Sequence, residues 1–111
     1  MPHPPSPAFL TVEAAWFWTS ATLRAREQRA AAPPGPCRAE DVIKCLDRLY
    51  RLRRIELMHV HILRRWGWRG RAPDGRCGME AAGWREALAC LDGPLRQRGI
   101  VACLANPAAW G

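Results

Sequence analysis

Residues 55–66, IELMHVHILRRW, constrain the fold of this 111-residue chain most, because they are apolar around most of a helical circumference. A helix with two apolar faces needs neighbours on both, so we expect this segment to be the central helix of its domain. His59 leans toward an apolar face, which predicts a hydrogen-bonded core histidine. The first apolar face carries Ile55, Met58, Ile62 and Trp66, and the second carries Leu57, Val60 and Leu63.

Apolar periodicity predicts three further helices, at 9–31, 39–52 and 79–92. The second should stop at its predicted end, because Arg53 would otherwise project into its apolar stripe. The last should end or kink at Pro94, which cannot donate a backbone hydrogen bond. We therefore expect an all-α fold, a small four-helix domain in which helices 39–52 and 79–92 pack on the central one.

The length suits one compact domain, and the only candidate boundary is a linker with three prolines. Ser6 or Thr11 caps the first helix, since both residue types favour helix N-termini. A short apolar run at 100–104 is either a docked tail or an edge strand. The predicted organisation is a disordered proline-rich arm at 1–8, a helix at 9–31, a linker at 32–38, a helical core domain at 39–104 and a tail at 105–111.

The helix at 9–31 has a second apolar surface besides its main stripe, because Trp16 and Trp18 point about 200° apart at 100° per residue. This helix either completes the bundle of its own chain or joins a second subunit. Aromatic anchors beside small residues that permit close approach favour a protein interface. The candidate interface residues are Phe17, Trp18, Ala21 and Ala25.

The chain is strongly basic, with a formal charge of +7, and 16 of its 17 basic residues are arginine. Such a charge attracts nucleic acid or another polyanion. Arginine, alanine, proline and glycine are also the residues that a GC-rich genome encodes most, so codon bias alone is the competing explanation of the charge.

The basic residues concentrate at 64–76, RRWGWRGRAPDGR, which holds five arginines, two tryptophans and three glycines without a helical or strand period. We expect a flexible connector between two helices, with Trp66 in the core and Trp68 exposed. Arginine binds phosphate bidentately and an exposed tryptophan stacks on an unpaired base. The candidate nucleic-acid-binding residues are Arg64, Arg65, Trp68, Arg69, Arg71 and Arg76, supported by Lys44, Arg48 and Arg51 on the solvated face of helix 39–52.

Catalytic and metal-binding patterns are missing from the sequence. The five cysteines form no CxxC pair, and His59 and His61 lie about 200° apart on a helix, so they cannot chelate one ion. No phosphate-binding glycine motif and no serine or cysteine catalytic motif occurs. We expect no enzyme activity, no cofactor, no metal and no small-molecule substrate.

Segments for targeting and membrane insertion are not expected either. The N-terminal apolar run lacks a preceding Lys or Arg and is interrupted by Glu13. No stretch reaches the roughly 18 apolar residues of a transmembrane helix. An odd number of unpaired cysteines is typical of a reducing compartment, which predicts a cytoplasmic protein without membrane contact.

The pattern CLDRLYRLRRIELMHVHILRRWGW, a break, then AAGWREALACLDGPLR, loosely resembles sigma-factor region 4 and related helix-turn-helix proteins over residues 39–98. The chain is also similar to small bacterial or prophage-type proteins of unknown activity. The resemblance implies short helices around a buried one and a DNA-reading last helix. The sequence departs from the helix-turn-helix pattern in two ways: its connector is longer than a helix-turn-helix turn, and its helix 79–92 is acidic overall.

These observations predict a small, basic, non-enzymatic DNA-binding or transcription-associated protein that docks on duplex DNA through the segment 64–76. The alternative is an adaptor or inhibitor that binds a protein through the aromatic face of helix 9–31 and the tryptophan connector. A homodimer through the same aromatic face stays open.

Overall fold

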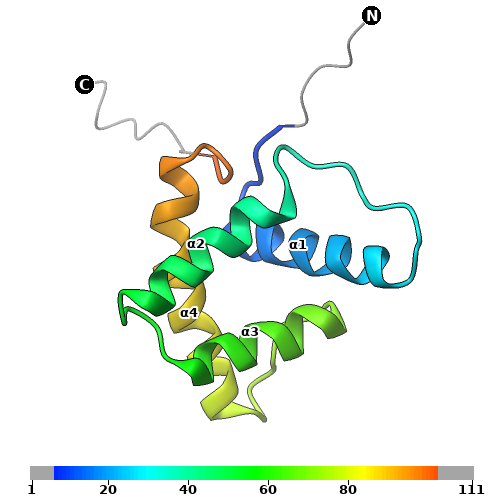
Figure 1. The fold of residues 1–111 in the computed structure, drawn as a ribbon. Coiled ribbons are helices and arrows are strands. Elements are labelled where there is room, and N and C mark those ends of the chain that lie inside the picture. The colour runs from blue at the N-terminus through cyan, green and yellow to red at the C-terminus, as the bar shows by residue number, and fades with distance from the viewer. Residues whose placement is uncertain (1–6, 103–111) are drawn as a thin grey trace, which may run out of the picture.

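Four helices follow one another in a computed structural model that describes residues 7–102 (Figure 1). The all-α fold predicted from the sequence is confirmed. The helices are α1 (Val12–Glu27), α2 (Ala39–Arg51), α3 (Leu57–Arg69) and α4 (Gly78–Gln97). The whole predicted tail at 105–111 and the proline-rich arm up to residue 6, with the candidate cap Ser6, lie outside the described residues.

Polar side chains mark where the first two helices begin and end. Thr11 is the cap that the structure uses for α1, since its Oγ1 accepts the backbone N–H of Ala14 at 3.0 Å. The N–H of Arg38 donates to the Asp41 carboxylate at 2.9 Å and closes the N-terminus of α2. Arg53 takes a left-handed conformation, with φ of 58°, and turns the chain toward α3. The predicted stop of this helix near residue 52 is confirmed.

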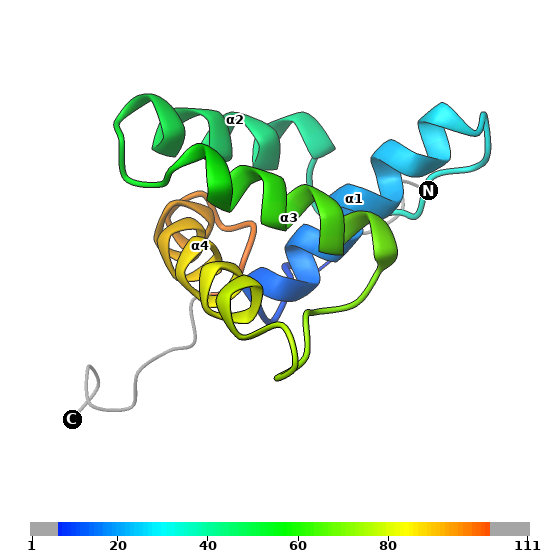
Figure 2. The ribbon, with the colours of Figure 1, turned by 90° about the horizontal axis from the view of Figure 1, so that it is seen from below.

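The helices form two layers, with α2 and α3 in one and α1 and α4 in the other (Figure 2). Both α2 and α3 pack against α1 and α4, whereas α2 and α3 barely contact each other. The first helix therefore completes the bundle of its own chain, and its Trp16 is buried in the common core with Leu63 and Leu91.

The prediction that helix 55–66 is the central one, with helices 39–52 and 79–92 packed on it, is wrong in one respect. Helix α3 packs on α4 and α1, but α2 stands apart from it. The inner face of α3 is buried, including the predicted core residue Trp66. However, Leu57 and Met58 are 53% and 45% exposed. Within the described residues, each predicted apolar face of α3 thus has one exposed residue in the first turn, although Leu63 of the second face is buried.

The segment RRWGWR is helical, which corrects its prediction as a flexible connector. Gly67 lies inside α3 because α1 approaches closely there: a Cβ at this position would stand 2.3 Å from Ser20 Oγ and 2.6 Å from Trp16 Nε1. The glycine therefore permits helix packing instead of breaking the helix. Gly70, with φ of 75°, ends α3.

Helix α4 continues through Pro94 and one turn beyond its predicted end at Asp92. Burial of Leu95 in the core offsets the cost of the missing proline N–H. Of the apolar run 100–104 the structure describes 100–102, and this part docks as a tail: Ile100 and Val101 are buried, and the Phe9 N–H donates to the Ile100 carbonyl at 2.9 Å. A single parallel bridge joins Phe9 to Val101, so the N-terminal segment lies beside the end of α4.

The second aromatic surface of α1 is covered within the chain. The Phe17 ring packs on Trp84 with ring centroids 5.5 Å apart, and Trp18 packs on Phe9 at 5.4 Å. The indole N–H of Trp18 donates to the carbonyls of Pro33 and Pro34, at 3.2 and 3.1 Å, so the proline linker lies over it.

Phe17, Trp18 and Ala21 are half-buried and Ala25 is buried. That these four residues form an interface with a partner or with a second copy of the chain stays a prediction.

Candidate binding groove between α2 and α3

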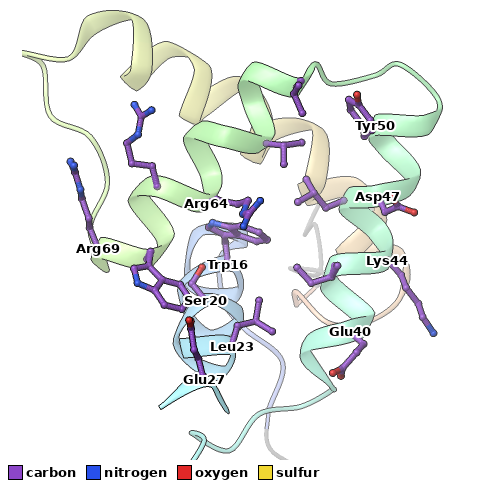
Figure 3. Close-up of a pocket in the computed structure, with 16 residues that line it drawn as sticks. Trp16, Ser20, Leu23, Glu27, Glu40, Lys44, Asp47, Tyr50, Arg64 and Arg69 are labelled. Carbon is purple, nitrogen blue, oxygen red and sulfur yellow. The ribbon is translucent and has the colours of Figure 1, made fainter. Parts of the chain in front are cut away.

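The gap between α2 and α3 is an open groove of about 1090 Å³, with α1 beneath it (Figure 3). Trp16, Ser20 and Leu23 of α1 form its floor. The Trp16 ring is held in place because its Nε1–H donates to the Leu63 carbonyl at 2.8 Å. The floor is thus mostly apolar and fixed by a buried hydrogen bond between α1 and α3.

One wall of the groove belongs to α3 and is basic. Leu57 and Val60 supply its apolar part, and Arg64, Trp68 and Arg69 extend it toward the C-terminus of the helix. Trp68 is 44% exposed, whereas Trp66 is buried. The expected difference between the two tryptophans is confirmed.

The arginines on this wall differ in their partners. Arg65 forms an ion pair with Glu80 of α4. The Arg69 guanidinium lies over the Trp66 ring, 4.8 Å from its centroid. Arg64 pairs with no carboxylate in the part of the chain that the structure describes.

A further arginine reaches this end of α3 from α1. The Arg24 Nη1 donates to the Trp68 carbonyl at 2.6 Å, across 44 positions of sequence. The contact places a guanidinium at the C-terminal end of α3, where free carbonyls favour positive charge. Sequence reasoning missed Arg24, and no local pattern could have revealed it.

The other wall belongs to α2 and combines apolar and charged side chains. Ile43 and Tyr50 are its apolar residues, and Glu40, Lys44 and Asp47 are charged. In Figure 3 α2 stands across the groove from α3, and the labelled Lys44 and Asp47 are directed away from α3. None of the ion pairs among the described residues spans the groove from α2 to α3.

The carboxylates of this wall are held by neighbouring arginines. Arg26 of α1 hydrogen-bonds Glu40 and, together with Arg38, lowers the pKa of that carboxyl to about 2. Arg51 pairs with Asp47 at 2.9 Å on the same helix. The Glu40 carboxyl is therefore ionised at neutral pH, and both carboxylates of the α2 wall are paired with arginines.

The predicted nucleic-acid-binding residues separate into two groups. Five of them line the groove, whereas Arg48 and Arg51 lie on α2 outside it and Arg71 and Arg76 lie in the loop after α3. Arg71 and Arg76 are exposed, and neither has an ion pair within the described residues. The five that line the groove are Lys44, Arg64, Arg65, Trp68 and Arg69.

His59 is a satisfied core histidine, as predicted. Its Nδ1 accepts the Glu56 backbone N–H at 2.9 Å, and its Nε2 lies 3.0 Å from the Glu86 carboxylate. One ring nitrogen thus bonds the start of α3 and the other contacts α4, so His59 joins these two helices.

Metal-ligating groups and thiols can be located among the described residues. Within 7–102, no group of three or more His, Cys, Asp or Glu side chains could hold a metal ion. Burial raises the pKa of the Cys37 and Cys45 thiols, which disfavours the nucleophilic thiolate. No helix in this range is long and apolar enough to cross a membrane.

Comparison with known proteins leaves the groove to be interpreted from its own geometry. No protein-family model, curated protein or solved structure matches this chain. The resemblance to sigma-factor region 4 stays a prediction.

Proposed function

We propose that this chain is a non-enzymatic nucleic-acid-binding protein whose contact surface is the C-terminal end of α3. The observation that carries the proposal is the surrounding of Trp68. Its indole is 44% exposed, Arg64 lies one helical turn before it, and Arg24 is bonded to its carbonyl. An exposed indole among guanidinium groups suits an unpaired base and its phosphates.

Arginines without a carboxylate partner support the end of α3 as the contact surface. Arg64, Arg69 and Arg71 have no carboxylate partner in the described range, so their charge is available to phosphates. The helix α4, which the resemblance would use for reading DNA, is net acidic between Met79 and Asp92. The surface that we propose therefore differs from that of a helix-turn-helix protein, and it favours single strands over duplex DNA.

The test is fluorescence anisotropy of labelled single-stranded and duplex oligonucleotides across a salt series. Replacing Arg64, Arg69 and Arg71 by alanine should weaken binding and flatten the salt dependence by about 0.7 slope units per lost contact with a single strand. Trp68→Ala should weaken single-strand binding at least about fivefold, because stacking on a base is lost.

The matched control removes three arginines elsewhere. Arg54, Arg85 and Arg98 are exposed and have no ion pair in the described chain, so their triple alanine variant loses the same net charge. Equal losses in the two triple variants would reject the α3 surface. Absence of binding at about 150 mM salt would leave the basic composition as codon bias.

A further inference from the structure

We propose that the groove between α2 and α3 binds an amphipathic α-helix of about three turns from a partner protein, with carboxylates along one edge of that helix. This is a second binding activity, and its site shares Arg64 with the nucleic-acid surface at the end of α3. It rests on three features of the groove: an unpartnered apolar surface, the length of its walls and the charges along its edges.

The unpartnered surface is the part of α3 that carries Leu57 and Val60, on the groove side of the helix. A helix that is apolar around most of its circumference is normally buried on all sides. The inner face of α3 meets this expectation through Ile62 and Leu63, but Leu57 faces the groove with 53% of its surface exposed. Tyr50, on the opposite wall, is 43% exposed. A helix laid between them would bury both side chains.

The dimensions of the groove match a short helix. Its α2 wall runs from Glu40 to Tyr50 and its α3 wall from Leu57 to Arg69. At 1.5 Å per residue, walls of this length are about 15–18 Å long, which is about three helical turns. Because α2 and α3 pack on α1 and α4 but barely on each other, the slot stays open along its length. The apolar floor would receive side chains spaced at i, i+3 or i+4, and i+7.

The two edges of the groove differ in charge. Arg64 stands on the α3 edge without a carboxylate partner in the described chain. The α2 edge is mixed, because Lys44 stands between Glu40 and Asp47 and both carboxylates are already paired with arginines. A partner helix with carboxylates facing Arg64 would complement the α3 edge. A nucleic acid would suit the groove poorly, because its phosphates would meet an apolar floor.

The probe is a fluorescein-labelled, 14-residue helical peptide with a leucine stripe, glutamates on one flank and lysines on the other. Its controls are a scrambled peptide of the same composition and a peptide with lysines on both flanks. The mixed peptide has no large net charge, so the basic protein does not attract it by charge alone. We expect a dissociation constant on the order of 10 µM for the mixed peptide and at least about tenfold weaker binding of both controls.

Two neighbouring residues provide a matched pair of protein variants. Leu57 and Met58 are both exposed in the first turn of α3, but only Leu57 lines the groove. An acidic residue is favourable at a helix N-terminus, so Leu57→Asp and Met58→Asp should both fold. We expect Leu57→Asp to weaken the peptide at least about tenfold and Met58→Asp less than about twofold.

A second pair tests the charged edge. Arg64→Ala should abolish the preference for the mixed peptide over the all-lysine peptide, and Arg48→Ala, which removes an exposed arginine outside the groove, should not. Leu57→Asp should leave affinity for oligonucleotides unchanged, which separates this proposal from the nucleic-acid surface. The peptide should also shift amide resonances of α2 and α3 in the intact protein.

Three results would overturn the proposal: equal binding of the mixed and scrambled peptides, equal effects of Leu57→Asp and Met58→Asp, or resonance shifts confined to other helices. A dimer in sedimentation that Leu57→Asp dissociates would also overturn it, since a second copy would then fill the groove.

Discussion

Replacing Gly67 by alanine should destabilise the protein, although alanine is the better helix former. Inside a helix, glycine-to-alanine substitution alone gains about 1 kcal/mol. The added Cβ would lie 2.3 Å from Ser20 Oγ and 2.6 Å from Trp16 Nε1, distances that real contacts do not reach. One of the two side chains or the helix α1 has to move.

The free-energy cost of that movement can be worked from the contacts. Overpacking of a buried site costs about 1–3 kcal/mol. Trp16 is 2% exposed and donates to the Leu63 carbonyl, so displacing it would also weaken a buried hydrogen bond, at about 1 kcal/mol or more. Set against the propensity gain, the expected net loss of unfolding free energy is about 2 kcal/mol.

Urea unfolding followed by circular dichroism measures this difference, with Gly78→Ala as the control. Gly78 is the first residue of α4, and a Cβ there would meet nothing within 4 Å. The control should be neutral or more stable by up to about 0.5 kcal/mol. If Gly67→Ala were as stable as the wild type or more so, the close approach of α1 and α3 at this residue would be refuted.

Three further outcomes are expected. Thr11→Ala should lower the unfolding free energy by about 1 kcal/mol and Thr11→Ser by less, because only the serine retains the capping hydroxyl, as thermal or urea unfolding would measure. The Glu40 pKa is about 2 in the fold against an ordinary 4.5, so its stabilising contribution is complete above pH 4.5 and is lost as the pH falls toward 2. Glu40→Gln should flatten urea midpoints over that window, and high salt should shrink the difference between the two proteins. Because Arg64 serves both proposed ligands, saturating helical peptide should weaken oligonucleotide binding, and the oligonucleotide should weaken the peptide by the same factor, which anisotropy titrations in both orders would test.

Local patterns in the sequence predicted the elements well, since their causes are local. The cap at Thr11 and the turn at Arg53 follow from residue chemistry within one helical turn. The burial of Trp66 and the exposure of Trp68 follow from helical spacing alone.

The exceptions come from contacts between distant segments. A glycine pattern alone cannot distinguish a helix break from a close helix approach, so Gly67 looked like the start of a connector. Only the position of α1, with Ser20 against the glycine, decides between them. The bond from Arg24 to the Trp68 carbonyl, 44 residues away, depends on the same α1–α3 packing.

The apolar circumference of α3 links the sequence to the candidate groove. Periodicity predicted burial for both of its faces, but the described fold leaves Leu57 and Met58 exposed, one from each face. The protein does not lack apolar partners for Leu57, since Tyr50 and Ile43 stand across the groove. They fail to meet because α2 and α3 both rest on α1 and α4, which hold them apart. Burial of Leu57 then requires a ligand. The apolar pattern that wrongly predicted α2 against α3 therefore also indicates where the groove lies. The contrast between Leu57→Asp and Met58→Asp tests this relation, because both side chains are exposed in the free protein and only one would be covered in the complex.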